Sequence, residues 1–367
     1  MCRRFEGRLA GATRRSGSRH FSGLVIPAGT ITMSHMDALG ADSDALPSLP
    51  DPRISLVVGT WSSDRWEDVA RLVRSARTQT RELHEFVLVV DHNPELLNRA
   101  QRAFSDVVCM PNCNERGAAG VKNTGLEKAA GDVIAFIDDD VEPEHDWLEA
   151  LAAGYALPNV LGVGGAIRPR WDIARPSWFP AEFDWVVGCT YTGHRIDAGP
   201  VRNLIGANMS IRRDVLSMLG GFRSEVGKVG NRSRPEETDL CLRAQVRWPD
   251  GRWIYVPDAL VHHRVPPKRA TARYFFSRCY HEGRGKADLV AAVGVQSGLS
   301  SEKKYVRQTL LSAIVHALVR LPRSHDIPSV KRAGTMAAGL AVTATGYANG
   351  ALLRHLDRVR SKVASRI

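Results

Sequence analysis

The sequence predicts an α/β protein with a mostly parallel sheet, helices on both sheet faces and a helical C-terminal extension. Short runs rich in Val and Ile alternate with amphipathic segments from residue 52 onward. The runs are continuously apolar, which is typical of parallel strands that are buried on both faces. With 367 residues, of which 44% are apolar and 24% charged, the chain is long enough for one large domain and an appendage.

The first half of the chain alternates strand and helix. The predicted strands are Ile54–Val58, Phe86–Val90, Val107–Met110 and Val133–Ile137. The predicted helices are Glu67–Thr78, Glu95–Phe104, Gly117–Ala129 and Glu144–Tyr155. In the first helix, Val69, Leu72 and Val73 follow helical spacing. Strands that alternate with helices in this way predict parallel pairing, with ligands bound beyond the carboxyl ends of the strands.

The second half has a different pattern. The expected elements are a strand at Val160–Ile167, an aromatic-lined loop over residues 168–200, a helix at Arg213–Leu219, a helix that begins after Pro235, and closing strands at Trp253–Val256 and Ala259–His263. Gly220-Gly221 is typical of a helix C-terminus. Proline is common in the first turn of a helix, so Pro235 indicates where the next helix begins.

The chain divides into four predicted parts. These are a disordered N-terminal extension (1–50), the α/β domain (51–265), a flap or linker helix (266–300) and a basic helical tail (301–367). The net charge of +11 is concentrated at the two ends, because residues 301–367 alone hold twelve Lys or Arg against three acidic residues. A basic tail favours an anionic partner such as the inner membrane leaflet. No zinc-finger or RNA-binding signature is present in the sequence, so we expect no nucleic-acid partner.

The tail contains a long stretch without charge. Ala333–Leu353 has 21 uncharged residues, which is long enough to span a bilayer, but it is rich in Gly, Ala and Thr. Gly346 and Gly350 form a GxxxG pair, which favours close helix packing. We expect helices that lie on the cytoplasmic face of the membrane. A single weak membrane span and a soluble helical hairpin are the alternative structures for the tail.

Six cysteines are scattered along the chain, which indicates idle thiols in a reducing cytoplasm.

Three consecutive aspartates, Asp138 to Asp140, end the apolar strand at Val133–Ile137. Crowded like charges are costly unless a cation neutralises them, and carboxylates suit Mg²⁺ or Mn²⁺. A solvated acidic loop that precedes the next helix is the alternative. Thr60 and Asp91 also fall at predicted strand ends, so all these polar side chains are expected at one edge of the sheet.

Six motifs in order carry a family resemblance. They are Ile54 to Trp61, Val89 to Asp91, Asn114 to Gly125, Asp138 to Asp140, Gly206 to Ser210 with Gly220 to Phe222, and Glu236 to Leu240. Over about residues 53–285 the chain resembles a family 2 inverting glycosyltransferase, whose GT-A fold is a Rossmann-like, mostly parallel sheet. The run from Arg278 to Lys286 is similar to a segment of actinobacterial-looking, membrane-associated members, and a mobile flap over the donor or an amphipathic surface helix is expected there.

The resemblance implies a site for a nucleotide diphosphate sugar. The donor-binding candidates are Thr60, Trp61, Asp91, Arg116, Lys122, Asp138 and Asp139. Asp91 would read the base and Asp138 would face the ribose, while Arg116 and Lys122 either touch the donor or lie on a solvated helix face. The candidate ligands of Mg²⁺ or Mn²⁺ are Asp140, Asp138 and His263. His262 and His263 alternate across the strand, so only one can face the site, and the other reading is a packed core histidine.

The resemblance also implies a catalytic base and an acceptor side. Asp239 is the preferred base, with Glu236 or Glu237 as alternatives, and ordinary helix N-terminal acids are the competing interpretation. Asn208, Trp171 and Trp178 are the acceptor-side candidates, although the two tryptophans could instead be a structural clasp.

These expectations define one leading function. It is the metal-dependent, inverting transfer of a sugar from a nucleotide diphosphate sugar, UDP rather than GDP, to a lipid-linked or polysaccharide acceptor at the cytoplasmic membrane face. A polyprenyl-phosphate sugar transferase is the second hypothesis. A non-catalytic nucleotide-sugar-binding protein of the same fold is the third.

Overall fold

The computed structural model describes residues 45–223, 228–229, 232–233, 236–293, 305–315 and 327–364. The strands of its central sheet are β1 (Ile54–Thr60), β2 (Glu85–Val90), β3 (Val108–Pro111), β4 (Val133–Asp138), β5 (Val141–Pro143), β6 (Val160–Trp171), β7 (Gly199–Val201), β8 (Asn208–Arg212) and β11 (Arg252–Val265). A separate pair is formed by β9 (Lys228–Val229) and β10 (Arg232–Ser233). Most of the extension expected at 1–50 lies outside the described residues.

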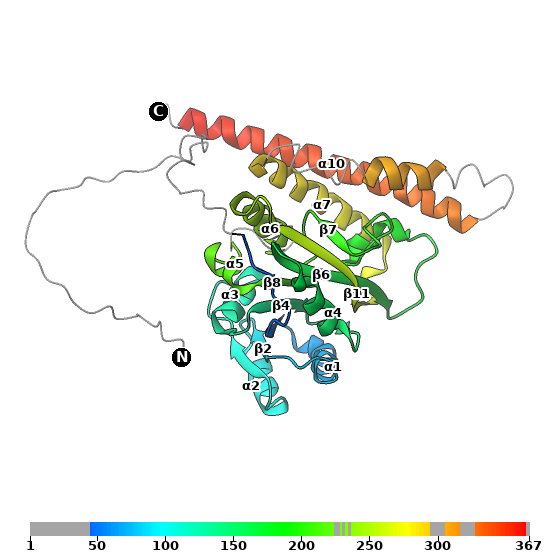
Figure 1. Ribbon diagram of the computed structural model, residues 1–367. Coiled ribbons are helices and arrows are strands. Elements are labelled where there is room, and N and C mark those ends of the chain that lie inside the picture. Colours follow the sequence, from blue (N-terminus) through cyan, green and yellow to red (C-terminus); the bar gives the residue numbers. More distant parts are fainter. Residues whose placement is uncertain are drawn as a thin grey trace, which may run out of the picture. The chain divides into compact units, whose positions relative to one another are not determined.

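Helices surround this sheet (Figure 1). They are α1 (Trp66–Arg77), α2 (Pro94–Ala103), α3 (Ala118–Lys128), α4 (Trp147–Ala153), α5 (Arg213–Met218), α6 (Glu236–Arg247), α7 (Ala272–Val293) and α10 (Ile327–Ala364). Shorter turns are η2 (Ser63–Arg65), η3 (Gly154–Ala156), η4 (Ala181–Val187), η5 (Pro267–Arg269) and η6 (Val306–Leu310).

The first half of the sheet is parallel, as predicted. β1 pairs in parallel with β2 and with β4, and β2 pairs in parallel with β3. Each strand and helix predicted in this half is present, although the helix expected at Glu144–Tyr155 is shorter and continues as η3. Because all four strands run the same way, their carboxyl ends meet at one edge of the sheet.

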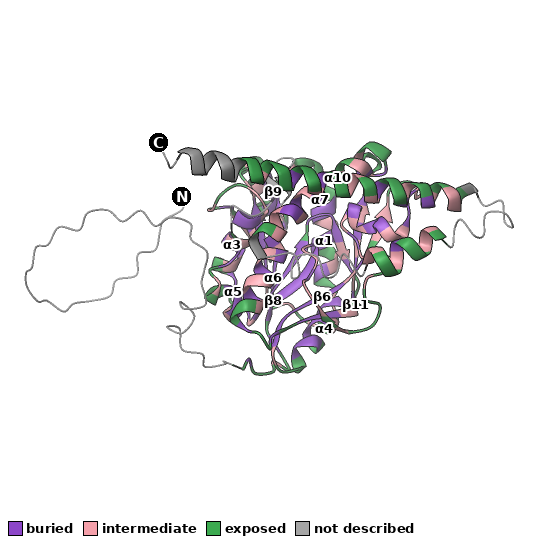
Figure 2. Cartoon of the chain, turned by 90° about the horizontal axis from the view of Figure 1, so that it is seen from above, coloured by how far each residue is buried: buried purple, intermediate pink, exposed green. Residues whose placement is uncertain are grey.

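Both faces of the sheet are covered by helices. Ile54, Leu56 and Val58 of β1 belong to a hydrophobic cluster that includes residues of α1, α2 and α4. Val57 points to the other face and belongs to a cluster with residues of α3, α5 and α6. Figure 2 shows the buried residues concentrated in the strands and in the helix faces that cover them. The period-2 alternation of side chains therefore builds two cores, one on each face.

Glycine allows α3 to lie very close to β1. A Cβ atom added at Gly125 would be 2.2 Å from Cγ1 of Val57, and one added at Gly59 would be 2.2 Å from Cγ1 of Val121. Distances this short exclude any side chain at either position. The glycines thus hold the start of α3 beside the carboxyl end of β1, where the candidate donor residues lie.

The second half of the sheet is mixed rather than parallel throughout. The sheet order is β3-β2-β1-β4-β8-β6-β11-β5, and β7 also pairs with β11. β8 is antiparallel to both β4 and β6, whereas β11 is parallel to β6 and antiparallel to β5 and β7. The two predicted closing strands are one long strand, β11, with a register shift between Val256 and Val261. The short β5, directly after the aspartates, had no counterpart in the prediction.

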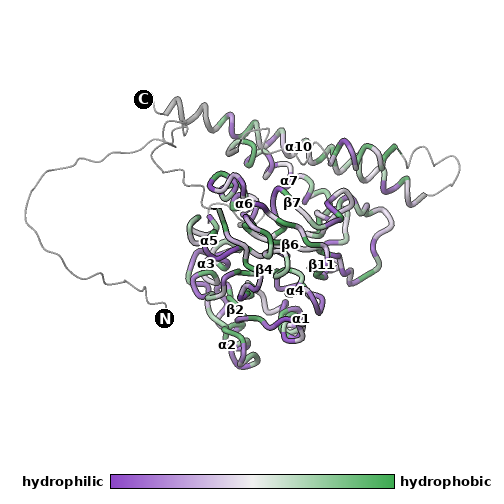
Figure 3. The backbone as a smooth tube through the Cα atoms, in the orientation of Figure 1, coloured by the Kyte–Doolittle hydropathy of each residue, from purple (hydrophilic) through white to green (hydrophobic). Residues whose placement is uncertain are grey.

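The described part of the tail packs on the domain. α10 lies along α7 (Figure 1), and a Cβ at Gly346 would be 2.1 Å from the carbonyl oxygen of Tyr280. A Cβ at Gly283 would likewise be 2.0 Å from the carbonyl oxygen of Thr343. Segment Ala333–Leu353 lies inside α10, whose apolar and polar residues are intermixed (Figure 3). Among the described helices, none is long and apolar enough to cross a membrane.

Candidate active site

The three aspartates lie where β4 leaves the sheet. Asp138, the last residue of β4, is exposed, whereas Asp139 and Asp140 are buried. Thr60, at the end of the neighbouring β1, donates a hydrogen bond of 2.7 Å from Oγ1 to Asp139. Arg65 of η2 bridges the two buried carboxylates, with Nη1 3.0 Å from Asp139 and 2.5 Å from Asp140. The carboxyl ends of β1 and β4 thus meet as the parallel pairing predicts.

The strand β11 brings His263 to the same cluster. Nε2 of His263 lies 3.1 Å from Oδ1 of Asp140, and the imidazole is buried. His262 points the other way, with Nε2 2.6 Å from Glu144. Strand alternation therefore separates the two histidines, and His263 is the one beside the aspartates.

Asp138, Asp140 and His263 form a group whose candidate ligand atoms all lie within 4.8 Å of one another. Two carboxylates and an imidazole suit a divalent ion such as Mg²⁺ or Mn²⁺. Positive groups already surround the same carboxylates, because Nη2 of Arg269 is 3.5 Å from Asp140 in addition to Arg65. Asp138 remains exposed and open to a ligand. The residues present therefore fit a metal.

Burial and neighbouring charges shift the pKa values of the two buried aspartates in opposite directions. Burial raises the pKa of Asp139 to about 7, and the nearby Asp140 carboxylate adds to the rise despite the opposing Arg65. Burial acts in the same direction on Asp140, but the attraction of His263 and Arg269 outweighs it and lowers the pKa of Asp140. Asp140 is consequently the stronger anion of the pair, as a metal ligand needs to be.

The candidate base-reading residue, Asp91, follows β2. Its carboxylate accepts hydrogen bonds from the Gly117 backbone N–H at 3.0 Å and from Asn112 Nδ2 at 2.7 Å, and it lies 2.7 Å from His92 Nδ1. These contacts fix the loop before α3. Of the neighbouring candidates, Trp61 is 63% exposed and Arg116 is also exposed. Both are accessible from solvent, and neither supports the sheet.

Lys122 of α3 connects the donor side to α6. Its Nζ is 2.9 Å from Oε1 of Glu236. Burial alone would lower the pKa of Lys122, but the nearby carboxylates of Glu236 and Glu237 outweigh burial and raise it. Asp138 contributes to the same rise, so Lys122 lies between the acid cluster of β4 and the acids of α6.

Glu237 is half-buried, and its pKa is raised. Burial and the charge of Glu236 raise the pKa of Glu237 to about 8, against an opposing effect of Lys122. A Cβ at Gly206 would be 3.5 Å from Cδ of Glu237 and 3.7 Å from Nζ of Lys122. The absence of a side chain at Gly206 therefore leaves room beside this acid.

Asp239, the preferred base of the sequence analysis, lies in a different environment. Its Oδ2 accepts a hydrogen bond of 2.8 Å from Nε of Arg243, and its Oδ1 is 3.6 Å from Nη1 of Arg223. Arg243 also donates to the carbonyl oxygens of Leu219 and Gly221. These contacts tie Asp239 to the turn after α5, so its carboxylate has a structural role at that turn.

The acceptor-side candidates occupy separate places. Asn208 is fully buried, and its side-chain amide accepts from Trp147 Nε1 at 2.9 Å and donates to Ala259 O at 2.8 Å. Both the oxygen and the nitrogen of its amide are thus hydrogen-bonded within the protein, where they join β8 to α4 and β11. Trp178 packs edge-on against Phe275 of α7, which favours the structural clasp for this residue.

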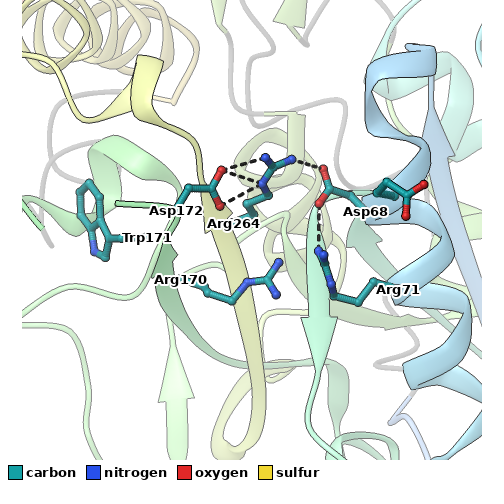
Figure 4. Close-up of a pocket in the computed structure, with 7 residues that line it drawn as sticks. Asp68, Arg71, Arg170, Trp171, Asp172 and Arg264 are labelled. Atoms are coloured by element: carbon teal, nitrogen blue, oxygen red, sulfur yellow. Dashed lines mark hydrogen bonds and ion pairs between the residues drawn. The ribbon is translucent and has the colours of Figure 1, made fainter. Parts of the chain in front are cut away.

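Trp171 lines a cavity of about 280 Å³ beside the aspartate cluster, between the ends of β6 and β11 and the start of α1. Figure 4 shows Arg264 between Asp172 and Asp68, and Nη1 of Arg264 is 2.8 Å from Asp68. The backbone N–H of Arg264 also donates to the carbonyl oxygen of Asp140 at 2.9 Å. The charged groups of this cavity pair mainly with one another and hold α1 against the long strands.

The sequence did not indicate two arginines of the site, Arg65 and Arg269. Arg65 is part of a single turn, and Arg269 belongs to a short turn after β11. No periodicity or motif distinguishes such residues from surface arginines. Arg269 could have been suspected from its position, because it lies only six residues after the candidate ligand His263.

The chain is similar in sequence to known glycosyltransferases. The model of the family described as "Glycosyl transferase family 2" matches residues 55–220. The chain is 32% identical over 309 residues to the glucosyl-dolichyl phosphate glucuronosyltransferase of Haloferax volcanii, covering 83% of this chain and 98% of that protein. It is 27% identical over 187 residues to the succinoglycan biosynthesis protein ExoM of Rhizobium meliloti, covering 49% and 55% of the two chains.

A solved structure shares the fold. The mannosyltransferase PcManGT of Pyrobaculum calidifontis, in complex with GDP-Man and Mn²⁺, aligns with a TM-score of 0.51 over 82% of this chain and 89% of that chain, at 19% identity. The described strands and helices therefore form a GT-A-type α/β fold. Because the match to the Haloferax protein runs along nearly its whole length, the chain belongs to the family 2 glycosyltransferases.

Proposed function

We propose that this glycosyltransferase is metal-dependent and inverting, and that it moves a sugar from a nucleotide diphosphate sugar to a lipid-linked or polysaccharide acceptor. The convergence of Asp138, Asp140 and His263 is the observation that carries the proposal. Their strands deliver two carboxylates and an imidazole to one edge of the sheet. A bound Mg²⁺ or Mn²⁺ would there offset the charge that develops on the departing diphosphate.

The chain's own residues would orient the donor around this point. We expect Asp91, whose carboxylate accepts a hydrogen bond from the N–H of Gly117, to accept a further hydrogen bond from the base. Arg65 and Arg269 contact the buried aspartates. If Asp138, Asp140 and His263 held a metal ion, the guanidinium groups would be free to bind phosphate oxygens, which Arg binds in bidentate fashion.

The acceptor hydroxyl needs a carboxylate to receive its proton, and the contacts favour Glu237 over Asp239. Glu237 lies with Lys122 beside Gly206, and Lys122 is close enough to Asp138 to respond to its charge. Asp239 is instead paired with Arg243. A single displacement, with Glu237 accepting the proton on the face opposite the leaving diphosphate, inverts the anomeric centre.

A lipid-linked acceptor is favoured by the similarity to the Haloferax relative, a glucosyl-dolichyl phosphate glucuronosyltransferase. We expect a UDP-sugar as donor. A second reaction, direct transfer to a polyprenyl phosphate, uses the same donor site. Product analysis with a glycosylated and an unglycosylated lipid phosphate distinguishes the two acceptors.

The test is isothermal titration of the protein with UDP and GDP, each with and without Mn²⁺. We expect metal-dependent binding of UDP, lost in Asp140→Asn and retained in Asp258→Asn, a matched change at an exposed position. Equal binding with and without Mn²⁺, or unchanged binding by Asp140→Asn, contradicts the metal site. A product with the same anomeric configuration as the donor contradicts the single displacement.

A further inference from the structure

The imidazole of His263 has polar neighbours at both of its ring nitrogens. Its Nε2 lies 3.1 Å from Oδ1 of Asp140 and 3.2 Å from Nη1 of Arg269. Its Nδ1 lies 3.7 Å from Sγ of Cys189, a residue 74 positions earlier in the chain. His263 and Cys189 are both buried, so groups of the protein itself surround the ring.

The turn after η4 brings Cys189 to this ring. η4 is followed by Gly188, whose φ of 81° lies in the left-handed region that glycine favours. The backbone N–H of Cys189 donates to the carbonyl oxygen of Asp184 at 3.0 Å, which closes the turn. A Cβ atom at Gly188 would lie 3.0 Å from Cε1 and 3.3 Å from Nδ1 of His263. The backbone of the turn therefore lies directly against the edge of the imidazole, and the thiol lies beside Nδ1.

The neighbours of Nε2 make opposite demands on the proton of the imidazole. A neutral imidazole has one N–H and one nitrogen lone pair. A guanidinium only donates, so the contact with Arg269 requires the lone pair on Nε2. The carboxylate of Asp140 only accepts and would favour the proton on the same nitrogen. The contacts of Nε2 alone therefore leave the proton unassigned.

The contacts of Cys189 assign the proton. Its Sγ lies 3.8 Å from the carbonyl oxygen of Val187, which can only accept, so the S–H of Cys189 is directed there. Burial raises the pKa of the Cys189 thiol, which keeps this proton on the sulfur. The sulfur lone pairs can then accept from the Nδ1–H of His263. With the proton on Nδ1, Nε2 presents its lone pair to the cluster that contains Asp138 and Asp140.

We propose that Cys189 is a positioning residue for His263, because its sulfur accepts the Nδ1–H and holds the tautomer in which Nε2 can bind a divalent cation. This inference rests on the metal site of the proposed function and adds a residue that does not itself touch the cation. A metal-binding histidine usually donates its other ring N–H to a protein acceptor, and loss of that acceptor weakens metal binding by roughly 10- to 100-fold. A thiol is a weak acceptor, so we expect the lower end of this range.

The first measurement identifies the tautomer without any metal. The full-length chain, with ¹⁵N-labelled histidine, is examined at mildly alkaline pH by long-range ¹H–¹⁵N correlation spectroscopy, and the signals of His263 are assigned with His263→Gln. We expect a protonated Nδ1 and an unprotonated Nε2 in the unaltered chain. Cys189→Ala should lose this preference, whereas Cys189→Ser, whose hydroxyl can accept the same N–H, should retain it.

The second measurement is the affinity for Mn²⁺, determined from the electron paramagnetic resonance signal of free Mn²⁺ during titration of the same proteins. Cys189→Ala should bind Mn²⁺ about tenfold more weakly than the unaltered chain, and Cys189→Ser should restore most of the affinity. The matched control is Cys279→Ala, which truncates another fully buried cysteine, on α7. It should leave the tautomer and the Mn²⁺ affinity unchanged. Melting temperatures report whether each variant folds, and the tautomer of the unaltered chain tests the proposal independently of all variants.

Three outcomes would overturn the role of Cys189. They are a protonated Nε2 in the unaltered chain, an unchanged Mn²⁺ affinity in Cys189→Ala, and an equal loss of affinity in Cys189→Ser or Cys279→Ala. The last outcome would mean that the cysteine only fills space, because a hydroxyl could not rescue a purely structural role. Failure of the proposed metal site is distinguishable, since the unaltered chain would then bind no Mn²⁺ with or without UDP, and the role of Cys189 would be withdrawn with it.

Discussion

Replacing Glu237 by Gln tests which carboxylate of α6 receives the proton of the acceptor. Glutamine keeps the size and hydrogen-bonding capacity of the side chain but cannot accept a proton. General-base catalysis typically contributes 10²–10⁴-fold, so we expect kcat to fall by roughly that factor. The KM for the donor should change little, because the role we propose for Glu237 concerns the acceptor.

Asp239→Asn is the matched variant on the same helix. Asp239 is bonded to Arg243 at 2.8 Å, and its loss should affect mainly the turn at Gly221. We therefore expect a loss in kcat of less than about tenfold, together with a lower melting temperature. A loss for Asp239→Asn as large as that for Glu237→Gln, with an unchanged melting temperature, would restore Asp239 as the base.

The pH dependence gives an independent check. Burial and Glu236 raise the pKa of Glu237 to about 8, and only the ionised form can act as base. With that value about one tenth of the molecules are active at pH 7, so kcat/KM should rise roughly tenfold between pH 7 and its plateau above pH 9. The assay is initial-rate measurement of nucleotide release in a series of buffers at constant Mn²⁺. A profile that is flat from pH 6 to 9 in the unaltered enzyme would refute the assignment.

Three further changes follow from the contacts. Lys122→Met removes the cation that lowers the pKa of Glu237, so the midpoint of the pH–rate profile should move to higher pH; a midpoint that moves down or stays contradicts the pairing. Asn208→Ala leaves Trp147 Nε1 and Ala259 O without their partner and should cost about 2–4 kcal/mol in urea unfolding, whereas an effect below about 0.5 would mean that the amide is not a structural crosslink. Gly346→Leu should force α10 away from Tyr280 and lower the melting temperature by several degrees, while Ala344→Leu, at an exposed position of the same helix, should not.

The parallel half of the fold was predictable because its information is local. The strands between Ile54 and Asp138 are mainly apolar runs, and α1 and α2 carry clear amphipathic spacing. The mixed half was harder, since antiparallel β8 and the short β5 pair with strands distant in sequence. The register shift that joins two expected strands into β11 likewise has no local signal.

The same distinction applies to the site. The positions of Thr60, Asp91 and Asp138 at strand ends follow from the sequence, because parallel strands must end together at one edge. The partners of these residues do not follow from it. Arg65 reaches Asp139 across 74 residues, and Lys122 reaches Glu236 across 114. The pairing of Asp239 with Arg243, four residues later in α6, does follow from helical spacing. Sequence spacing could not tell that the half-buried Glu237 would lie beside Lys122.

The sequence by itself determined the fold class, the location of the acid cluster at a sheet edge and the family resemblance that the comparisons bear out. These depend on periodicity and residue order, which are properties of short segments. Only the tertiary structure decided which acids are paired with a cation, which acids have a raised pKa, and which surface of α10 is left exposed. Those outcomes depend on burial and on distances between segments far apart in the chain. The pKa of a carboxylate, and therefore the chemistry it can perform, depends on the groups that the fold packs against it.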